Sequence, residues 1–146
     1  MSEIKIPEIK LAVGYRRVSD EKQIERASLD TQSVMIKRYC DQNGLTLIHI
    51  YEDKGLSGRE TEGRQGYQEM LKVVKPGWFV VIYDTSRLNR NAQESMNFYY
   101  DLRKMGCIIV SATQAIDSRE RDAELKWTIH TAVDREESNK ISDRVK

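Results

Sequence analysis

Two short stretches of this sequence are almost entirely apolar, and they constrain the fold more than any other feature. Residues 78–83 read WFVVIY, and residues 107–113 read CIIVSAT. A strand with one face in water alternates apolar and polar residues, whereas a strand buried on both faces is continuously apolar. Neither stretch approaches the roughly 20 apolar residues of a membrane span. The sequence therefore predicts two buried strands of a parallel sheet.

Helices and strands are predicted to alternate along the whole chain. A strand at residues 10–18 precedes a helix at 28–43, which is capped by Ser28 and stopped by Gly44. The elements that follow are a strand at 45–51, a helix at 67–74, the strand at 78–83, a helix at 92–105, the strand at 107–113 and a helix from 121 to the end. This order requires crossover connections, so the predicted class is α/β, with a mostly parallel sheet and helices on both faces.

The length of 146 residues corresponds to one ordinary domain. We divide it into an α/β core at residues 1–120 and one long helix at 121–146. The apolar residues expected to pack that helix on the core are Leu125, Ile129, Ala132 and Val133. Beyond them only Ile141 and Val145 are apolar, so the second half cannot be packed on this core. It is either a frayed surface helix or a protruding helix that meets a partner subunit or DNA and continues into sequence not present here.

Charge gives no support for DNA binding by the domain as a whole. The chain carries 24 basic and 23 acidic residues, a net charge of +1, whereas nucleic-acid-binding domains usually show a basic excess or stripe. Contact with nucleic acid would depend on a few focused arginines or on another domain. The N-terminus mixes both charge signs and has no signal-like apolar segment, so we expect a cytoplasmic protein with no membrane association.

Metal sites and several common catalytic motifs are disfavoured. The two cysteines, Cys40 and Cys107, lie far apart and the chain has only two histidines, so no zinc site is expected. The sequence contains no GxxxxGK[ST], no GxGxxG and no GxSxG. These absences argue against a P-loop nucleotide hydrolase, a dinucleotide-binding enzyme and a hydrolase with a nucleophile elbow.

Arginines gather instead near the predicted carboxyl ends of the strands, where the working loops of such sheets lie. They are Arg17, Arg59, Arg64, Arg87 and Arg90, and they share that edge with Ser19. A planar guanidinium can hold two phosphate oxygens, and several guanidiniums repel one another unless an anion lies between them. The cluster indicates a phosphate-handling site. Taken singly, Ser19 is typical of a turn at a strand end, and Arg87 and Arg90 are equally compatible with a solvated helix face.

Four motifs in this order give a more specific indication. They are YRRVS at residues 15–19, SLDTQ at 28–32, DKGLSG at 53–58 and RLNR at 87–90. Together they closely resemble the catalytic domain of the serine recombinases, the resolvase/invertase/integrase family, and the resemblance extends from Leu11 to Lys146. Two details are most similar to the large serine recombinases of phages and mobile elements: the long segment between Ser19 and Ser28, and the sequences EES at 136–138 and ISDRVK at 141–146.

The resemblance implies a site-specific DNA recombinase that needs no metal, no ATP and no other cofactor. Ser19 would attack a DNA phosphodiester, form a 5′-phosphoserine link and free a 3′-hydroxyl. The other catalytic positions would be Arg17, Arg87 and Arg90, which bind the scissile phosphate, and Tyr15. Supporting or phosphate-binding positions would be Arg64, Gln32, Asp53, Ser57 and Glu137. The implied partners are double-stranded DNA at recombination sites and further copies of the chain, as a dimer that pairs into a tetramer.

A catalytically inactive relative is one alternative. The family usually has Asp-Arg where this chain has Ser86-Arg87, and Ser138 replaces an arginine of the long helix. Such a relative would bind DNA or an active partner without cutting. The retention of Ser19 beside so many arginines argues against it, because an inactive site has no physical need for them.

A receiver-like phospho-acceptor is the other alternative. It would use Asp53 or Asp84 at a strand end, with Asp20 and Glu21 completing a site for Mg²⁺. No lysine is well placed for that chemistry. The alternative predicts Mg²⁺-dependent, acid-labile labelling of an aspartate.

Overall fold

The computed structural model describes residues 8–19, 22–55, 65–87 and 92–145, and for residues 18–19, 22–30, 54–55, 87 and 135–145 it describes the backbone alone. Within these ranges strands and helices alternate. The elements are β1 (Lys10–Ser19), α1 (Lys22–Gln42), β2 (Leu45–Gly55), α2 (Gln65–Val73), β3 (Phe79–Ile82), the 3₁₀ turn η1 (Thr85–Arg87), α3 (Ala92–Lys104), β4 (Ile108–Ser111) and α4 (Ala123–Val145). The predicted α/β order is confirmed.

Two predicted boundaries were wrong. The first helix begins at Lys22, so Ser28 lies inside α1 instead of capping it. Residues 22–27 read KQIERA, and most of them are good helix formers, so the helix can extend past a serine that only favours a helix start. The second strand continues to Gly55, four residues beyond the predicted end.

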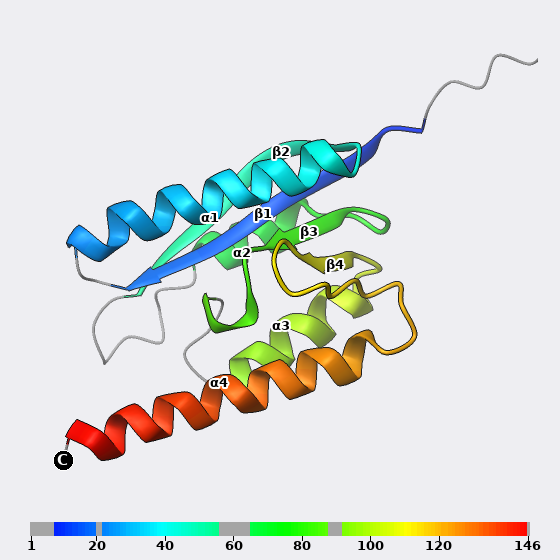
Figure 1. Cartoon of the computed structure of the whole chain (residues 1–146). Coiled ribbons are helices and arrows are strands. Elements are labelled where there is room, and N and C mark those ends of the chain that lie inside the picture. The colour runs from blue at the N-terminus through cyan, green and yellow to red at the C-terminus, as the bar shows by residue number, and fades with distance from the viewer. Residues whose placement is uncertain (1–7, 20–21, 56–64, 88–91, 146) are drawn as a thin grey trace, which may run out of the picture.

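The four strands form one parallel sheet in the order β2-β1-β3-β4. Figure 1 shows α1 on one face, and α2 and α3 on the other, with α4 lying alongside α3. The helix that follows β1 and the helix that follows β3 therefore lie on opposite faces of the sheet. From β1 the chain moves to β2 on one side of the sheet, and from β3 it moves to β4 on the other side. The boundary between β1 and β3 is therefore a switch point, and ligand crevices of such sheets open there, beyond the carboxyl ends of the strands.

Each face of the sheet has its own core. On the α1 side, Ile36 and Cys40 pack against strand residues that include Ala12 and Val81. The other side is rich in aromatic rings: Tyr15 and Phe98 have ring centroids 5.4 Å apart, and Phe98 stacks on Trp127 at 6.1 Å. Each buried large side chain contributes about 1.5–3 kcal/mol, so the sheet is held firmly between its two helical layers.

The alignment of β1 with β2 depends on a bulge. Ala12 pairs with Leu47, whereas Val13 pairs with His49, so Ile48 is an extra residue in β2. After the bulge the register runs on to Arg17 opposite Asp53 and Ser19 opposite Gly55. The strands beyond the bulge carry the residues of the candidate site.

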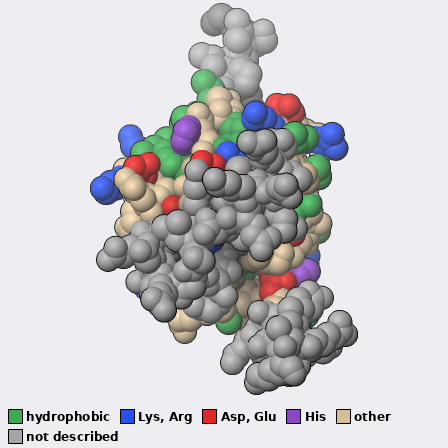
Figure 2. All heavy atoms as spheres, turned by 90° about the vertical axis from the view of Figure 1, so that its left-hand side faces the viewer, with side chains coloured by type: hydrophobic (Ala, Val, Ile, Leu, Met, Phe, Trp, Pro, Cys, Tyr) green, Lys and Arg blue, Asp and Glu red, His purple; other side chains and the backbone are tan. Residues whose placement is uncertain are grey.

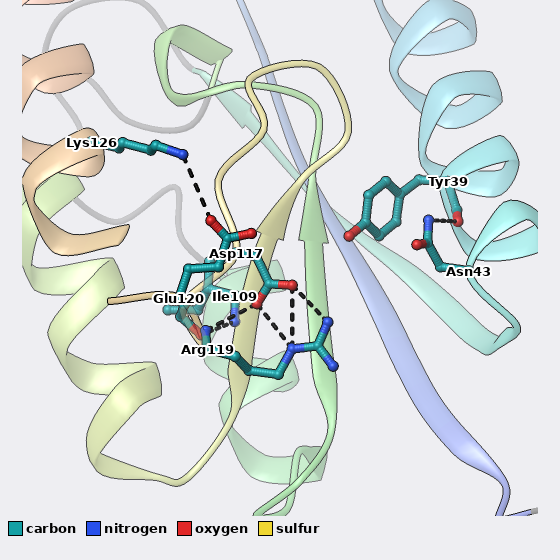
Figure 3. Close-up of polar contacts among 8 residues, drawn as sticks. Tyr39, Asn43, Ile109, Asp117, Arg119, Glu120 and Lys126 are labelled. Carbon is teal, nitrogen blue, oxygen red and sulfur yellow. Dashed lines mark hydrogen bonds and ion pairs between the residues drawn. The ribbon is translucent and has the colours of Figure 1, made fainter. Parts of the chain in front are cut away.

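The connection from β4 to α4 returns the chain to the amino ends of the strands. Asp117 forms an antiparallel bridge with Val110, and the Ser118 hydroxyl accepts a hydrogen bond of 2.8 Å from the Ile109 N–H. Figure 3 shows the Arg119 guanidinium against the Asp117 carboxylate, with Nη2 to Oδ2 at 2.6 Å. Hydrogen bonds from the Arg119 side chain are the largest cause that lowers the pKa of Asp117. These contacts fix the point at which α4 begins.

The expectation for the buried face of α4 was wrong. Leu125, Ile129 and Val133 are 62%, 52% and 48% exposed, and Ala132 is exposed too. The buried face is formed by Ala123, Trp127 and Thr131. Trp127 donates from Nε1 to the Ser95 carbonyl at 3.1 Å, and the Ser95 and Thr131 hydroxyls are 2.9 Å apart. A large ring and a satisfied polar pair therefore decide which face is buried. None of the helices in the described ranges combines the length and apolar character that crossing a membrane requires.

Candidate active site at the carboxyl edge of the sheet

The carboxyl ends of β1 and β3 bring two predicted site residues to one edge of the sheet. β1 ends at Ser19, and η1, which ends at Arg87, follows β3 after two residues. β1 and β3 pair from Ala12 opposite Phe79 to Tyr15 opposite Ile82, and β1 is in contact with η1. For Ser19 and Arg87 only the backbone is described. The topology therefore delivers both positions to the switch point between β1 and β3.

Figure 2 looks onto this edge, with the residues that are not described drawn in grey. Around them, acidic and basic side chains are mixed. Arg64, Arg90 and Ser57 fall outside the described residues, and Glu137 lies in α4 where only the backbone is described.

Arg17 is the predicted phosphate-binding residue whose side chain the structure describes. Its side chain is 9% exposed, and its Nη1 donates to Glu94 Oε2 at 3.2 Å. Glu94 lies in the first turn of α3 and is 21% exposed. The charge of Arg17 is thus balanced by a neighbouring helix, at the border between the core and the open edge.

Gln32 reaches the same stretch of β1 from the opposite face. Its Nε2 lies 3.4 Å from the Arg17 carbonyl, and the side chain is buried in α1. The predicted positions Arg17 and Gln32 are therefore brought together, with the glutamine bonding to the backbone of β1.

Tyr15 and Asp53 are also brought together. The Tyr15 hydroxyl donates to Asp53 Oδ2 at 2.6 Å, and both side chains are buried. Tyr15 lies among the rings of Tyr67 and Phe98. Its hydroxyl therefore faces a carboxylate inside the protein, not the open edge.

Asp53 holds the start of α2 as well. Its carboxylate accepts from the Gly66 N–H at 2.7 Å and from the Tyr67 N–H at 3.1 Å. Backbone N–H groups in the first turn of a helix take their partners from outside the helix. A Cβ on Gly66 would lie 2.2 Å from the Glu52 carbonyl oxygen, so this close approach of α2 to β2 needs glycine. Asp53 thus links β1, β2 and the first turn of α2.

One acidic residue near the arginines, Glu94, was missed by the sequence analysis, and a second, Asp84, was considered there only as a phospho-acceptor. Glu94 is the partner of Arg17, and Asp84 accepts a 2.7 Å hydrogen bond from the Ser86 hydroxyl. The departure at Ser86 therefore does not leave the turn without a carboxylate. The four-residue spacing from Arg90 to Glu94 in the sequence was the available signal, but nothing in the sequence connects Glu94 to Arg17.

The described side chains offer no metal site. Among them, no group of three His, Cys, Asp or Glu residues is arranged to hold a metal ion. Cys40 and Cys107 are buried free thiols, and burial raises the pKa of Cys40 to about 11.

Comparison with known proteins identifies the family. The family model for the N-terminal domain of resolvase matches residues 12–146. The chain belongs to the resolvase family of serine recombinases. Among curated relatives, the serine recombinase gin of Escherichia phage Mu is 31% identical over 109 residues, which cover 74% of this chain and 50% of that protein. A resolvase of Clostridium perfringens (strain 13 / Type A) is 32% identical over 101 residues, covering 69% and 48%. The chain thus spans about half the length of the curated relatives it matches.

Solved structures agree with this assignment. A resolvase family site-specific recombinase from Streptococcus pneumoniae is 30% identical and superposes with a TM-score of 0.67, over 94% of this chain and 93% of that one. The N-terminal catalytic domain of TP901-1 integrase is 23% identical, with a TM-score of 0.64 over 89% and 98%, which is a likeness of fold. The reported relatives of this serine recombinase domain are thus a phage serine recombinase and resolvases, and its place in the large branch stays a prediction.

Proposed function

We propose that this serine recombinase domain cuts and rejoins double-stranded DNA at specific sites through a covalent 5′-phosphoserine intermediate. The observation that carries the proposal is the meeting of β1 and η1 at the switch point of the sheet. β1 contributes Arg17 and, two residues later, Ser19, and η1 contributes Arg87. A hydroxyl nucleophile and two cations from distant parts of the sequence thereby belong to one edge.

The proposed reaction exchanges one phosphate ester for another. The Ser19 hydroxyl oxygen forms a bond to phosphorus while the bond from phosphorus to the DNA 3′ oxygen breaks. The proton that serine loses ends on the released 3′-hydroxyl. A 3′-hydroxyl from another strand then attacks the phosphoserine, breaks the serine ester and joins the strands. The number of phosphate ester bonds is the same before and after, so no ATP is consumed.

The arginines supply what such a step needs most. Serine is a weak nucleophile at its ordinary pKa, and phosphoryl transfer depends mainly on positioning and on neutralising the oxygens of the phosphate. We assign Arg17, Arg87 and Arg90 to the scissile phosphate, with Arg64 as a further phosphate ligand. Guanidinium groups can do this work without a metal ion, because they keep their charge and donate several hydrogen bonds.

The remaining predicted positions are assigned supporting roles. The bond of Tyr15 to Asp53 and the bond of Gln32 to the β1 backbone support positioning roles for these three residues. Asp53 also orients the start of α2, which follows residues 56–64. Ser57 and Glu137 keep the supporting roles that the family resemblance gives them.

The proposal extends to the partners of residues 121–146. Leu125, Ile129 and Val133 are spaced four residues apart and form an apolar stripe on the exposed face of α4. Apolar stripes of this kind favour association with another protein surface. We assign α4 to a protruding role in which it meets a second copy of the chain, as a dimer that pairs into a tetramer on DNA.

A covalent-adduct assay tests the function. The full-length protein is incubated with duplex DNA that was selected for binding to this protein. The DNA is nicked near the point of strand exchange, so that cleavage cannot be reversed. We expect a protein–DNA adduct that survives denaturation and acid and forms in EDTA, and none from Ser19→Ala. Binding without an adduct would support the inactive relative. An adduct of equal yield from Ser19→Ala would refute the role of Ser19, and Mg²⁺-dependent, acid-labile labelling would support the aspartate acceptor.

A further inference from the structure

A buried threonine connects the turn that carries Arg87 to helix α4. Thr85 is the first residue of η1 and is 3% exposed. Its hydroxyl Oγ1 donates to Asp134 Oδ2 of α4 at 2.8 Å. Its backbone N–H donates to Gln114 Oε1 at 2.9 Å, and Gln114 Nε2 donates back to Thr85 Oγ1 at 3.2 Å. We call Thr85, Gln114 and Asp134 the Thr85 bridge.

The donors and acceptors of the Thr85 bridge fit together in one arrangement. An ionised carboxylate only accepts hydrogen bonds, so the Thr85 hydroxyl proton must point to Asp134, and the hydroxyl oxygen is left to accept from Gln114. The Gln114 amide cannot turn over, because its oxygen already receives the Thr85 N–H. Gln114 Nε2 also lies 3.3 Å from His130 Nδ1, which adds a second residue of α4. The bridge therefore fixes one relative position of η1 and α4.

Three separate parts of the chain meet in this bridge. Thr85 follows β3, Gln114 follows β4, and Asp134 lies on α4, 49 residues after Thr85. The contact between η1 and α4 is direct. Since Thr85 and Arg87 belong to the same three-residue turn, a shift of α4 that pulls on Thr85 also moves the backbone of Arg87.

We propose that Thr85, Gln114 and Asp134 are positioning residues, which couple the placement of α4 to the placement of Arg87 at the scissile phosphate. This inference rests on the proposed function for the role of Arg87, and on the described contacts alone for the coupling. In this proposal the Thr85 bridge holds helix α4 and the turn that carries Arg87 in one fixed relative position. Binding of a second copy at the exposed stripe of α4 would act on the Thr85 bridge directly, because Val133 of the stripe precedes Asp134 of the bridge in the chain.

Four variants and one control separate coupling from a general loss of stability. Thr85→Val keeps the shape but removes the hydroxyl, and Thr85→Ser retains it. Asp134→Ala removes the acceptor, and Asp134→Asn retains an oxygen that can accept. The control is Glu124→Ala, which removes the same charge from α4 and breaks a hydrogen bond to the Tyr100 hydroxyl without touching η1. Urea unfolding of each variant checks that it is folded under assay conditions.

The first measurement needs no DNA. Hydrogen exchange of the full-length protein should be about tenfold faster at the backbone amides of residues 85–87 in Thr85→Val and Asp134→Ala, and within twofold of wild type in Thr85→Ser, Asp134→Asn and Glu124→Ala. Unchanged exchange in the two disrupting variants would overturn the proposal. If Thr85→Val does not fold, Asp134→Ala gives the same test, since Asp134 is only partly buried.

The second measurement concerns the chemistry at saturating nicked DNA. Adduct formation should be about tenfold slower in Thr85→Val and Asp134→Ala, DNA affinity should stay within threefold, and Thr85→Ser should restore the rate. Faster exchange with an unchanged adduct rate would overturn the link to Arg87 and leave the proposed function standing. If wild-type protein itself forms no adduct, the proposed function fails, and the exchange result alone then decides whether η1 and α4 are coupled.

Discussion

Replacing Gly66 with alanine tests how closely α2 must approach β2. The added Cβ would lie 2.2 Å from the Glu52 carbonyl oxygen, 2.8 Å from the Glu52 carbonyl carbon and 3.0 Å from Asp53 Oδ1. Ordinary contacts begin at 3.4 Å, so the first turn of α2 would have to move by about 1.2 Å, the difference from the shortest distance. Two of the three neighbours are backbone atoms, which cannot rotate away as a side chain can.

That movement acts on the bonds that hold the helix start. The N–H groups of Gly66 and Tyr67 donate to Asp53 at 2.7 and 3.1 Å, and a shift of this size takes both beyond hydrogen-bonding distance. Overpacking a core site costs about 1–3 kcal/mol, and each hydrogen bond to a charged group contributes about 1.5–3 kcal/mol. Part of the loss is recovered by relaxation, so we expect Gly66→Ala to lower the free energy of unfolding by about 3–5 kcal/mol.

Urea unfolding followed by far-UV circular dichroism measures this change. Gly44→Ala is the matched control, because Gly44 has a φ of +67° and nothing within 4 Å of its added Cβ. It should cost about 1–2 kcal/mol, the cost of a left-handed conformation for a residue with a side chain. A Gly66→Ala variant that is no less stable than Gly44→Ala would refute the reasoning about the close approach of α2.

Three further predictions concern charge and burial. Because burial raises the pKa of Cys40 to about 11, alkylation of this thiol at pH 8 should be at least ~100-fold slower in the native protein than in urea; equal rates would contradict its burial. The lowered pKa of Asp117 means that its pairing with Arg119 stabilises the fold above the unfolded pKa of about 3.9 and is lost as pH falls through the lower folded value. Asp117→Asn should therefore lose less stability than wild type between pH 5 and 2, and parallel acid titrations would disprove this. Glu94→Gln should release Arg17 from its ion pair and strengthen DNA binding about two- to tenfold at low salt, measured by fluorescence anisotropy. Binding as weak as in wild type would show that Glu94 does not compete with DNA for Arg17.

The sequence predicted the sheet well because strand burial leaves a local signature. The runs at residues 78–83 and 107–113 needed no knowledge of distant residues, and the turns at Gly44 and Gly106 have the positive φ values that stop a helix. The order of elements then restricted the topology, which brought Ser19 and Arg87 to one edge.

The buried face of α4 could not be predicted in the same way. Two series with four-residue spacing run along this helix, one through Leu125 and Ile129 and the other through Trp127 and Thr131. Counting apolar residues favours the first series. The structure buries the second, because the Trp127 ring packs in the core and the Thr131 hydroxyl meets the Ser95 hydroxyl inside the protein. A polar residue that finds a buried partner is invisible to hydrophobic periodicity.

The candidate site shows the same limit. Motif resemblance found Tyr15 of β1 and also Asp53 and Gln32, whose side chains hydrogen-bond to residues of β1. It did not find Glu94 or Thr85, since their partners lie 77 and 49 residues away in the sequence. Such pairings are set by how helices pack, and they leave no spacing pattern along the chain.

One extra residue in β2 determines whether the acid of that strand can serve the site at all. Neighbouring residues of a strand point to opposite faces of the sheet, so the extra residue Ile48 determines which face each later residue of β2 points to. If Ile48 instead paired regularly with Val13, Asp53 would move opposite Val18 and turn toward α1. Tyr15 and the start of α2 would then lose their shared carboxylate in a single step. Deleting residue 48 would instead leave Asp53 opposite Arg17, because His49 would then follow Leu47 directly. Natural variation in this part of the family should therefore tolerate that deletion better than a one-residue insertion between His49 and Asp53.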